Sequence, residues 1–304
     1  MKFDKETWRL AQILDSRLYE FTDIGSKREF FAKELNIPEQ TARAMLYALE
    51  NRDLIAGTPE VILAKDGDVE FGIGDLHIPF VDRYALDTSI NYAIKHHNVN
   101  RVTLNGDIFD FYKISYFKKN PTKGVSLIEE FNQTREILEY IRKAFPDAYI
   151  NFLKGNHEKR FIDCIDSKAP DYHELIDGML QNRLGFDELG IDYKDNFYQY
   201  GELYHIHGDE VRCSGGVINV CKVLMSKILH NFVTWHFHTT QEYIVKRIDN
   251  SILGGWAVGH LATDKAFEDY AQINNWNQGF AIIEYDSKGE FTMHNKKICN
   301  GKVY

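Results

Sequence analysis

The chain has 304 residues, of which 44% are hydrophobic and 13% aromatic. This is enough apolar material for one sizeable domain plus a small one, and it excludes a chain that is disordered throughout. The formal net charge of -9 excludes a broadly basic surface for nucleic acid or anionic membrane. A polyanion would therefore have to bind at a local, metal-assisted site.

The cysteines and the start of the chain indicate a compartment. The four cysteines, Cys164, Cys213, Cys221 and Cys299, are widely spaced and form no Cys-x-x-Cys pair. This pattern is typical of reduced thiols in a cytosolic protein. The first residues lack the apolar core of a signal peptide, and no run approaches the apolar length of a membrane helix. We therefore expect a cytoplasmic protein with no membrane partner, and the oligomeric state stays open.

The apolar pattern of residues 4–53 predicts helices only. The stretch 31–43 resembles a helix-turn-helix of the winged-helix kind, with Asn36 where many such turns have glycine; asparagine also enters the left-handed region. Residues 1–60 carry nine basic and eleven acidic side chains, unlike a typical DNA-reading module. DNA binding and a structural or protein-docking role are therefore both open. Residues 56–59, Ala-Gly-Thr-Pro, predict the boundary between a helical domain, 1–60, and a second domain, 61–304.

From Val69 onward, predicted strands and helices alternate, which indicates an α/β domain. The first strands and helices are predicted at 69–73, 82–97, 101–104, 125–145 and 149–153. Helices are expected within 172–189. Later strands are predicted at 203–206, 232–235, 243–248, 279–285 and 291–294.

Hard metal ligands follow several of these strands. Five short segments carry them, in this order: Asp75-Leu76-His77, Gly106-Asp107-Ile108-Phe109-Asp110, Gly155-Asn156-His157-Glu158, His207-Gly208 and His236-Phe237-His238. Open α/β sheets bind ligands at the carboxyl ends of their strands. Carboxylate, imidazole and amide ligands without thiolates indicate an open catalytic site, not a closed structural zinc site. An Asp or Asn beside glycine is by itself more often a turn residue, so the prediction depends on the ordered set.

The ordered set resembles the calcineurin-like metallophosphoesterase superfamily, whose pattern is DxH, GDxxD, GNH(E/D), HG and GHxH. The resemblance spans Asp75 to His238 and departs from the pattern once, because Trp235 stands where the last motif has glycine. It implies an αββα sandwich that hydrolyses phosphoesters with a hydroxide bridging two metals about 3.5–4 Å apart. We expect manganese, with Fe, Zn, Ni, Co or Mg as alternatives.

The resemblance also implies a role for each matching residue, with Asp107 bridging the two metals. The first metal would be held by Asp75, His77, Asp107 and His238, and the second by Asp107, Asn156, His207 and His236. His157 would protonate the leaving oxygen or stabilise the phosphate. Asp110 would orient His157. Arg160 would clamp a phosphate oxygen, or it forms a surface salt bridge.

Two positions allow a second interpretation. In His205-Ile206-His207, strand alternation sends both histidines to one face, and we select His207 because it precedes glycine. A second Gly-His pair occurs at His260, but Ala262 stands where another histidine would be needed. His236 and His238 are therefore the better pair.

Two aromatic stretches follow the motifs. Tyr112 and Tyr116 could stack on nucleobases, and Lys118 and Lys119 after them could bind phosphate. Alternatively, these residues form an ordinary helix that packs its aromatic side chains and exposes its lysines. Residues 275–280 could line the site, although a plain hairpin is the simpler interpretation.

The preferred function is a metal-dependent phosphodiesterase or nuclease acting on DNA. The motif Gly106-Asp107-Ile108-Phe109-Asp110 resembles the DNA-repair exonuclease branch, and its combination with a helix-turn-helix resembles phage-borne and bacterial members of the superfamily. A phosphomonoesterase acting on nucleotides or phosphoproteins is the alternative within enzymes. A nucleic-acid-binding regulator with a degenerate metal domain is the alternative outside them.

Overall fold

The computed structural model describes residues 24–37, 42, 59–116, 120, 122–176, 178–213, 217–269 and 274–304. The chain divides into two units, Met1–Thr58 and Pro59–Tyr304. In the first, helix α2 (Ile24–Glu34) ends at a turn where Asn36 has a φ of 49°, which confirms the left-handed conformation expected there. Most of the predicted recognition helix lies outside the described residues, so the helix-turn-helix stays a prediction.

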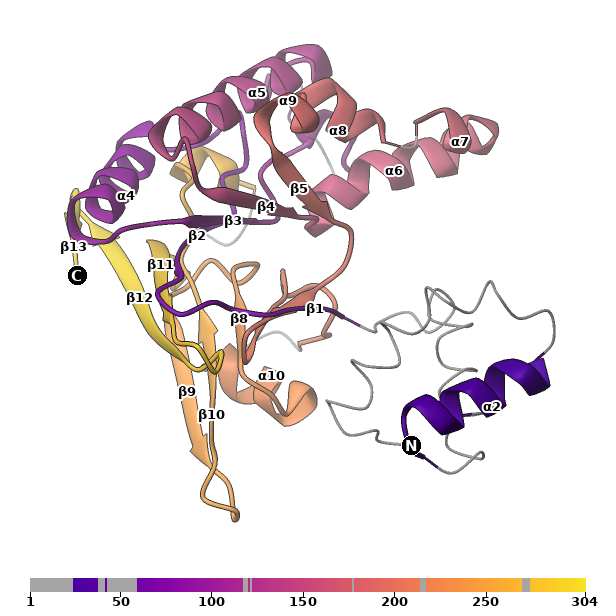
Figure 1. The fold of residues 1–304 in the computed structure, drawn as a ribbon. Helices are drawn as coiled ribbons and strands as arrows, with labels where there is room; N and C mark the ends of the chain where they lie inside the picture. The colour runs from indigo at the N-terminus through magenta and orange to yellow at the C-terminus, as the bar shows by residue number, and fades with distance from the viewer. Residues whose placement is uncertain are drawn as a thin grey trace. The chain divides into compact units, whose positions relative to one another are not determined.

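Two β-sheets form the second unit (Figure 1). The seven-stranded sheet has the order β13-β12-β11-β2-β3-β4-β5, and the six-stranded sheet has the order β1-β6-β7-β8-β10-β9. In chain order the strands are β1 (Glu60–Ile62), β2 (Val69–Ile73), β3 (Arg101–Asn105), β4 (Tyr149–Leu153), β5 (Ile191–Lys194), β6 (Tyr198–Tyr200), β7 (Leu203–His205), β8 (Phe232–Thr234), β9 (Gln241–Lys246), β10 (Ile252–Ala257), β11 (Gln278–Tyr285), β12 (Phe291–Cys299) and β13 (Lys302–Val303).

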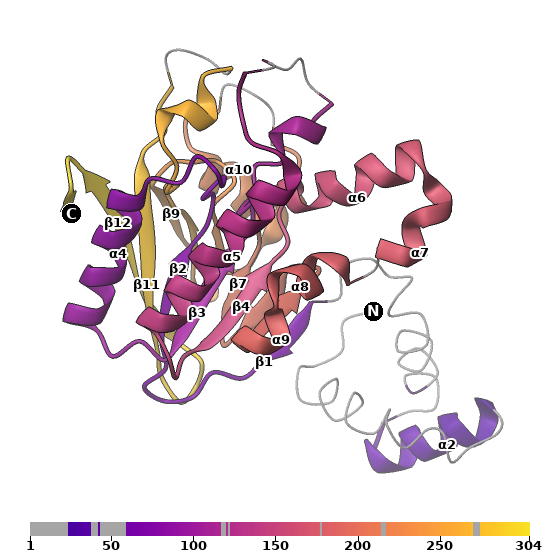
Figure 2. The same ribbon diagram turned by 90° about the horizontal axis from the view of Figure 1, so that it is seen from above.

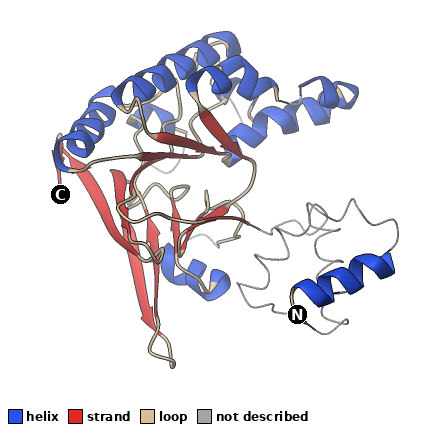
Figure 3. Ribbon diagram, in the orientation of Figure 1, coloured by secondary structure: helices blue, strands red, loops and turns tan. Residues whose placement is uncertain are grey.

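Helices cover the outer faces of the two sheets. The described α-helices of this unit are α4 (Arg83–His96), α5 (Leu127–Ala144), α6 (Asn156–Lys168), α7 (His173–Ile176), α8 (Met179–Leu184), α9 (Phe186–Leu189) and α10 (Val220–Ile228), with 3₁₀ helices at Tyr112–Ile114, Pro170–Tyr172 and Asp264–Phe267. Helices α4, α5, α8 and α9 lie over the seven-stranded sheet, and α10 lies against the other (Figures 1 and 3). The layers are helix, sheet, sheet, helix, which confirms the expected α/β sandwich. None of the described helices combines the length and apolarity needed to cross a bilayer.

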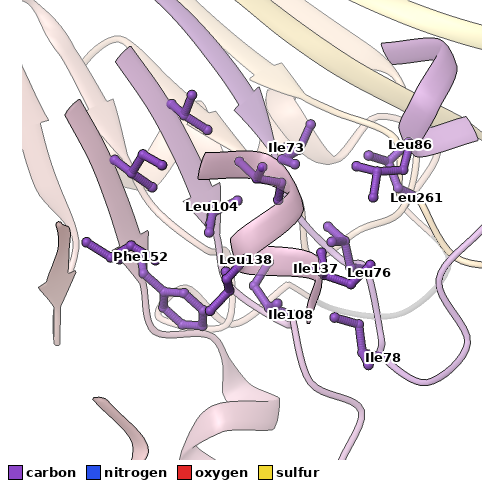
Figure 4. Packing of buried hydrophobic residues seen from close by; sticks show 14 of the residues in the cluster. Ile73, Leu76, Ile78, Leu86, Leu104, Ile108, Ile137, Leu138, Phe152 and Leu261 are labelled. Carbon is purple, nitrogen blue, oxygen red and sulfur yellow. The ribbon is translucent and has the colours of Figure 1, made fainter. Parts of the chain in front are cut away.

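The central strands β2, β3 and β4 pair in parallel, with β3 in the middle. Every residue of β3 is buried, as expected for a parallel strand covered on both faces. On the helical side, Leu86 of α4 and Ile137 and Leu138 of α5 belong to one apolar cluster with Leu104 and Phe152 of the sheet (Figure 4). This packing holds the ends of the three strands in a fixed register.

Strand β10 was not predicted from the sequence, because Gly254 and Gly255 weaken its strand pattern. A Cβ on Gly255 would lie 2.4 Å from the Phe232 ring of neighbouring β8. Glycine is therefore required for the close packing of these two strands. The last ligand motif lies directly after β8, in the turn that leads to β9.

Candidate metal centre

The first three motifs leave the sheet at adjacent points, where β2, β3 and β4 end. Seen from above, these parallel strands lie side by side under the helices (Figure 2). The loops are bonded to one another: the Asp75 N–H donates to the Gly106 carbonyl at 3.0 Å, and the His77 N–H donates to the Asp107 carbonyl at 3.0 Å. The backbone thus gathers the ligand side chains at one edge of the sheet.

Four of the predicted ligands have left-handed backbone conformations. The φ angles are 49° at Asp75, 47° at His77, 50° at Asp107 and 56° at His238. Such conformations cost a non-glycine residue about 1–3 kcal/mol each and cluster at functional sites. The packed strands below therefore hold the ligand loops in shapes that the loops would not adopt alone.

The first ligand group contains Asp75, His77 and His238, whose ligand atoms all lie within 4.8 Å of one another. His238 Nε2 lies 3.3 Å from His77 Nε2 and 3.3 Å from Asp75 Oδ2. Asp75 is fully buried, and neither of its carboxylate oxygens has a hydrogen-bond partner among the described residues. A buried, unpaired carboxylate is costly. A divalent cation would satisfy this donor set.

The second ligand group contains Asp107, His207 and His236, again within 4.8 Å. His207 Nε2 lies 3.3 Å from Asp107 Oδ2 and 3.1 Å from Asn156 Oδ1, and 3.3 Å separates it from His236 Nδ1. His207 Nδ1 lies 3.0 Å from the Asn105 carbonyl. This carbonyl holds the proton on Nδ1 and leaves Nε2 as the ligand atom.

Asp107 also forms a third group, with His77 and His157. It is therefore close to ligands on both sides of the centre. A Cβ on Gly155 would lie 2.4 Å from Asp107 Oδ1, and one on Gly106 would lie 2.4 Å from His207 Nδ1. The glycines of the second and third motifs thus make room for the ligands of their neighbours.

His157 lies in the first turn of α6, with its ring directed at this carboxylate. Its backbone N–H donates to Asp107 Oδ1 at 2.8 Å, and its Nε2 lies 3.7 Å from Asp107 Oδ2. Its Nδ1 lies 2.8 Å from the backbone carbonyl of Asp110. We expected the Asp110 carboxylate to orient His157, but this carboxylate lies 3.3 Å from His77 Nδ1 instead. Asp110 therefore contacts His157 through its main chain and the predicted ligand His77 through its side chain.

Arg160 is half-buried one turn further along α6. Its Nη1 donates to the same Asp110 carbonyl at 2.9 Å. The observed partner is thus a backbone group and not the carboxylate of a surface salt bridge. Arg160 supports the turn that orients His157, and its contact with phosphate stays a prediction.

Two buried glutamates hold the ligand loops, and sequence reasoning gave neither a role. The Glu158 carboxylate, on α6, accepts hydrogen bonds of 2.8–3.1 Å from four backbone N–H groups, those of Asp107, Ile108, Phe109 and Gly155. The Glu130 carboxylate, on α5, accepts from the N–H groups of Asp110 and Phe111 at 3.1 and 2.6 Å. The motif position after His157 could have signalled Glu158. No motif includes Glu130.

The structure places His207, not His205, among the ligands. Both histidines face the seven-stranded sheet, as strand alternation predicts, but at different depths. His205 Nε2 lies 2.8 Å from Glu70 Oε1 in a fully buried pair. Its ring also stacks on Tyr198, with centroids 4.7 Å apart. His205 is therefore part of the core between the sheets.

The tryptophan that departs from the family pattern is fully buried between the sheets. A Cβ on Gly74 would lie 2.8 Å from Trp235 Cγ, and one on Gly72 would lie 3.0 Å from the far edge of the indole. The indole of Trp235 thus fills the space that side chains at Gly72 and Gly74 would otherwise occupy. The His238 N–H donates to the Trp235 carbonyl at 2.8 Å, so the turn that presents His236 and His238 is intact.

Aromatic rings border the first ligand group. Phe267 and Trp276, which we call the aromatic wall, have ring centroids 4.7 and 5.0 Å from that of His238. His260 is almost fully buried behind His238, with the ring centroids 5.6 Å apart. Trp276 comes from the stretch that we interpreted as a plain hairpin. The structure therefore favours the alternative, in which this stretch lines the site.

The aromatic residues after the second motif lie in different environments. Tyr112 is largely buried, and its hydroxyl accepts from the Asn120 N–H at 2.7 Å. The Tyr116 hydroxyl donates to the Asp163 carbonyl of α6 at 2.9 Å. The Tyr112 ring is packed in the interior, whereas Tyr116 is 65% exposed and is anchored through its hydroxyl. The following residues, 117–119, lie outside the described part of the chain.

Burial and crowding of like charges shift several pKa values in the metal-free site. Burial, together with the Asp107 carboxylate, raises the pKa of Asp75 to about 8. Burial opposes charge on Asp107 too, but His157 and His207 outweigh it and hold the Asp107 pKa well below its usual range. Burial lowers the pKa of His157 to about 3, so that this imidazole is neutral at pH 7.

These shifts predict that metal affinity rises with pH. Below about pH 8 a proton occupies Asp75 and must leave before the carboxylate can bind a cation. One competing proton changes the apparent affinity by up to about tenfold per pH unit. Calorimetric titration with Mn²⁺ at pH 6.5, 7.5 and 8.5, in buffers of different ionisation enthalpy, measures both the affinity and the proton release. Equal affinities at the three pH values, without proton release, would contradict this assignment.

No family model matches the chain, and no curated protein matches it. Among solved structures it is similar to Vps29 from Chaetomium thermophilum, with 12% identity and a TM-score of 0.41 over 78% of this chain and 95% of that chain. It is also similar to wild-type Vps29 complexed with Zn²⁺ from Entamoeba histolytica, with 13% identity and a TM-score of 0.39 over 78% of this chain and 96% of that chain.

Proposed function

We propose that the chain is a metal-dependent phosphoesterase of the calcineurin-like type that uses two divalent cations. The observation that carries the proposal is the position of Asp107, which lies within ligand distance of His207 and His236 on one side and of His77 and His157 on the other. One carboxylate shared by two ligand groups is the arrangement expected of a dinuclear centre. The ordered motifs and the unpaired Asp75 carboxylate also support it.

The ligands divide between two cation positions. Asp75, His77 and His238 would hold the first cation, and His207, His236 and Asn156 the second, with Asp107 shared. When bound, the pair would activate water and neutralise charge on the phosphate. The oxygen and nitrogen donors suit Mn²⁺, and Fe, Zn, Ni, Co or Mg are the alternatives.

The chain's own residues would orient the substrate and manage protons. His157 has Nδ1 bound to a carbonyl, so its Nε2 faces the centre. Because its pKa is low in the metal-free site, the imidazole can donate a proton only where the substrate's negative charge raises that pKa. Arg160 supports the turn behind His157, and Glu158 holds the Asp107 loop.

The surroundings of the centre support a phosphodiester over a phosphomonoester. The aromatic wall borders the first ligand group at His238, and a pocket opens beside His236 in the second. One substituent of a phosphate at the centre could thus enter the pocket while a second contacts the aromatic wall, and only a diester carries two. Aromatic rings stack on nucleobases of any sequence, which favours a nucleic acid, and we propose DNA as the substrate.

Steady-state hydrolysis of bis(4-nitrophenyl) phosphate and 4-nitrophenyl phosphate tests this function. We expect turnover that requires added Mn²⁺, is lost with a chelator, and has at least about a tenfold higher kcat/KM for the diester, since the second substituent adds binding. A preference for the monoester would favour the phosphomonoesterase alternative. A metal-loaded protein without turnover on either substrate would favour the binding-protein alternative.

A further inference from the structure

A pocket of about 520 Å³ opens next to the second ligand group. Residues 208–213 form one side of it, and His236 and Phe237 form the other. We call it the His236 pocket. Its volume lies within the roughly 300–1,000 Å³ that small-molecule sites occupy. Because His236 belongs to both the pocket and the centre, a group bound in the pocket is adjacent to a phosphate held at the metals.

The loop that forms the pocket is held in place by specific contacts. The Glu210 carboxylate accepts from the His207 N–H at 3.1 Å and from the Gly208 N–H at 2.7 Å. Gly208 has a φ of 133°, and a Cβ there would lie 2.5 Å from Thr234 Oγ1. The Lys227 ammonium of α10 donates to the Arg212 carbonyl. The hydrogen bonds tie the loop to His207 and to α10, and Gly208 packs closely against β8.

Three kinds of side chain meet in the pocket. Phe237 is half-buried; its ring packs against the apolar cluster under α10 and meets the His236 ring edge-on, with centroids 5.1 Å apart. Asp209 offers an exposed carboxylate, and Arg212 an exposed guanidinium. The pocket thus combines an aromatic ring, a hydrogen-bond acceptor and a fork of donors.

We propose that the His236 pocket binds the terminal nucleoside of a phosphodiester substrate, on one side of the scissile phosphate. The base stacks on Phe237, Arg212 donates to acceptors on the edge of the base, and Asp209 accepts from a free sugar hydroxyl. The Asp209 carboxylate repels a further phosphate at that hydroxyl, which is why a terminal nucleoside fits best. This inference rests on the proposed phosphodiesterase function and adds a substrate class to it.

Selectivity measurements test the pocket through its aromatic ring. The readout is the ratio of kcat/KM for thymidine 5′-(4-nitrophenyl phosphate) to that for methyl 4-nitrophenyl phosphate, which have the same leaving group. Phe237→Leu keeps apolar volume but removes the ring, and we expect the ratio to fall roughly 10-fold to 100-fold, the range for loss of one stacked base. Phe237→Tyr should restore it. Tyr172→Leu and Arg247→Ala, both at exposed positions away from the pocket, should leave it unchanged.

A binding measurement gives a second readout that needs no turnover. Titration of the Mn²⁺-loaded protein with thymidine 5′-monophosphate should show at least about tenfold tighter binding than with deoxyribose 5-phosphate, and Phe237→Leu should remove the difference. Equal binding of the two, or an unchanged kinetic ratio in Phe237→Leu, would overturn the pocket while leaving phosphoester hydrolysis intact. Nucleotide preference without hydrolysis of any diester would instead sink the proposed function and leave the pocket standing.

Discussion

Asp107→Asn will lose both metal ions and nearly all activity. The substitution keeps a residue that tolerates the φ of 50° at this position, but it removes the charge that Asp107 contributes both to the second ligand group and to the group with His77 and His157. Loss of a supporting residue around a metal commonly costs 10–100-fold in affinity or activity, so loss of the shared ligand should cost at least about 10³-fold in turnover. Elemental analysis of Mn²⁺-reconstituted protein, with hydrolysis of a chromogenic diester, measures both effects.

The control for this experiment is Asp187→Asn, an exposed carboxylate on α9. It should keep two metals per chain and full activity. Retention of one metal in Asp107→Asn would remove the bridging assignment. A wild-type protein that binds one metal or none would remove the dinuclear proposal itself. Circular dichroism of each variant separates these outcomes from misfolding.

His157→Ala will keep both metals and lower turnover by about 10²–10⁴-fold, the usual size of a lost general acid or base. The residue contacts Asp107 through its backbone N–H, which alanine retains, so the metal ligands stay in place. The loss should be smaller for nitrophenolate than for an alkoxide leaving group, because nitrophenolate needs little protonation.

The dependence on the leaving group identifies what His157 does. Equal losses for good and poor leaving groups would show that the imidazole stabilises the phosphate and does not donate a proton. His157→Gln, which can donate a hydrogen bond but no proton, serves as the matched variant. It should recover activity only if the imidazole of His157 stabilises the phosphate and does not donate a proton. Loss of metal from His157→Ala would instead assign His157 as a ligand.

The ligand motifs could be predicted from the sequence because each follows a strand or a strand turn whose apolar pattern is strong. The strands that precede Asp75, Asp107 and Asn156 are almost wholly buried. In each of them apolar residues recur at every second position, which is a strand pattern: Val69, Phe71 and Ile73; Val102 and Leu104; Ile150 and Phe152. The predicted bounds of β2 and β4 are those observed. A resemblance then assigned the ligands, and the structure brings all of them together.

What the sequence did not reveal depends on contacts between distant segments. Glu130 is one of many acidic residues on an amphipathic helix, and only the fold shows that its carboxylate reaches the Asp110 turn. The role of Asp110 was misassigned because a motif names side chains, whereas a backbone carbonyl orients His157. Strand β10 was missed because Gly255 serves packing against Phe232, a contact that no local pattern contains.

The left-handed backbone at the ligand positions allows the requirement for a backbone conformation to be distinguished from the requirement for a side-chain charge. Asparagine satisfies such a φ about as well as aspartate does, so the shape of the loops would survive exchange of Asp75 or Asp107 for its amide. A scaffold kept only for its shape would be free to make that exchange. Under the proposed function, the charge of a bound cation, and not the geometry of the chain, requires carboxylates at these two positions.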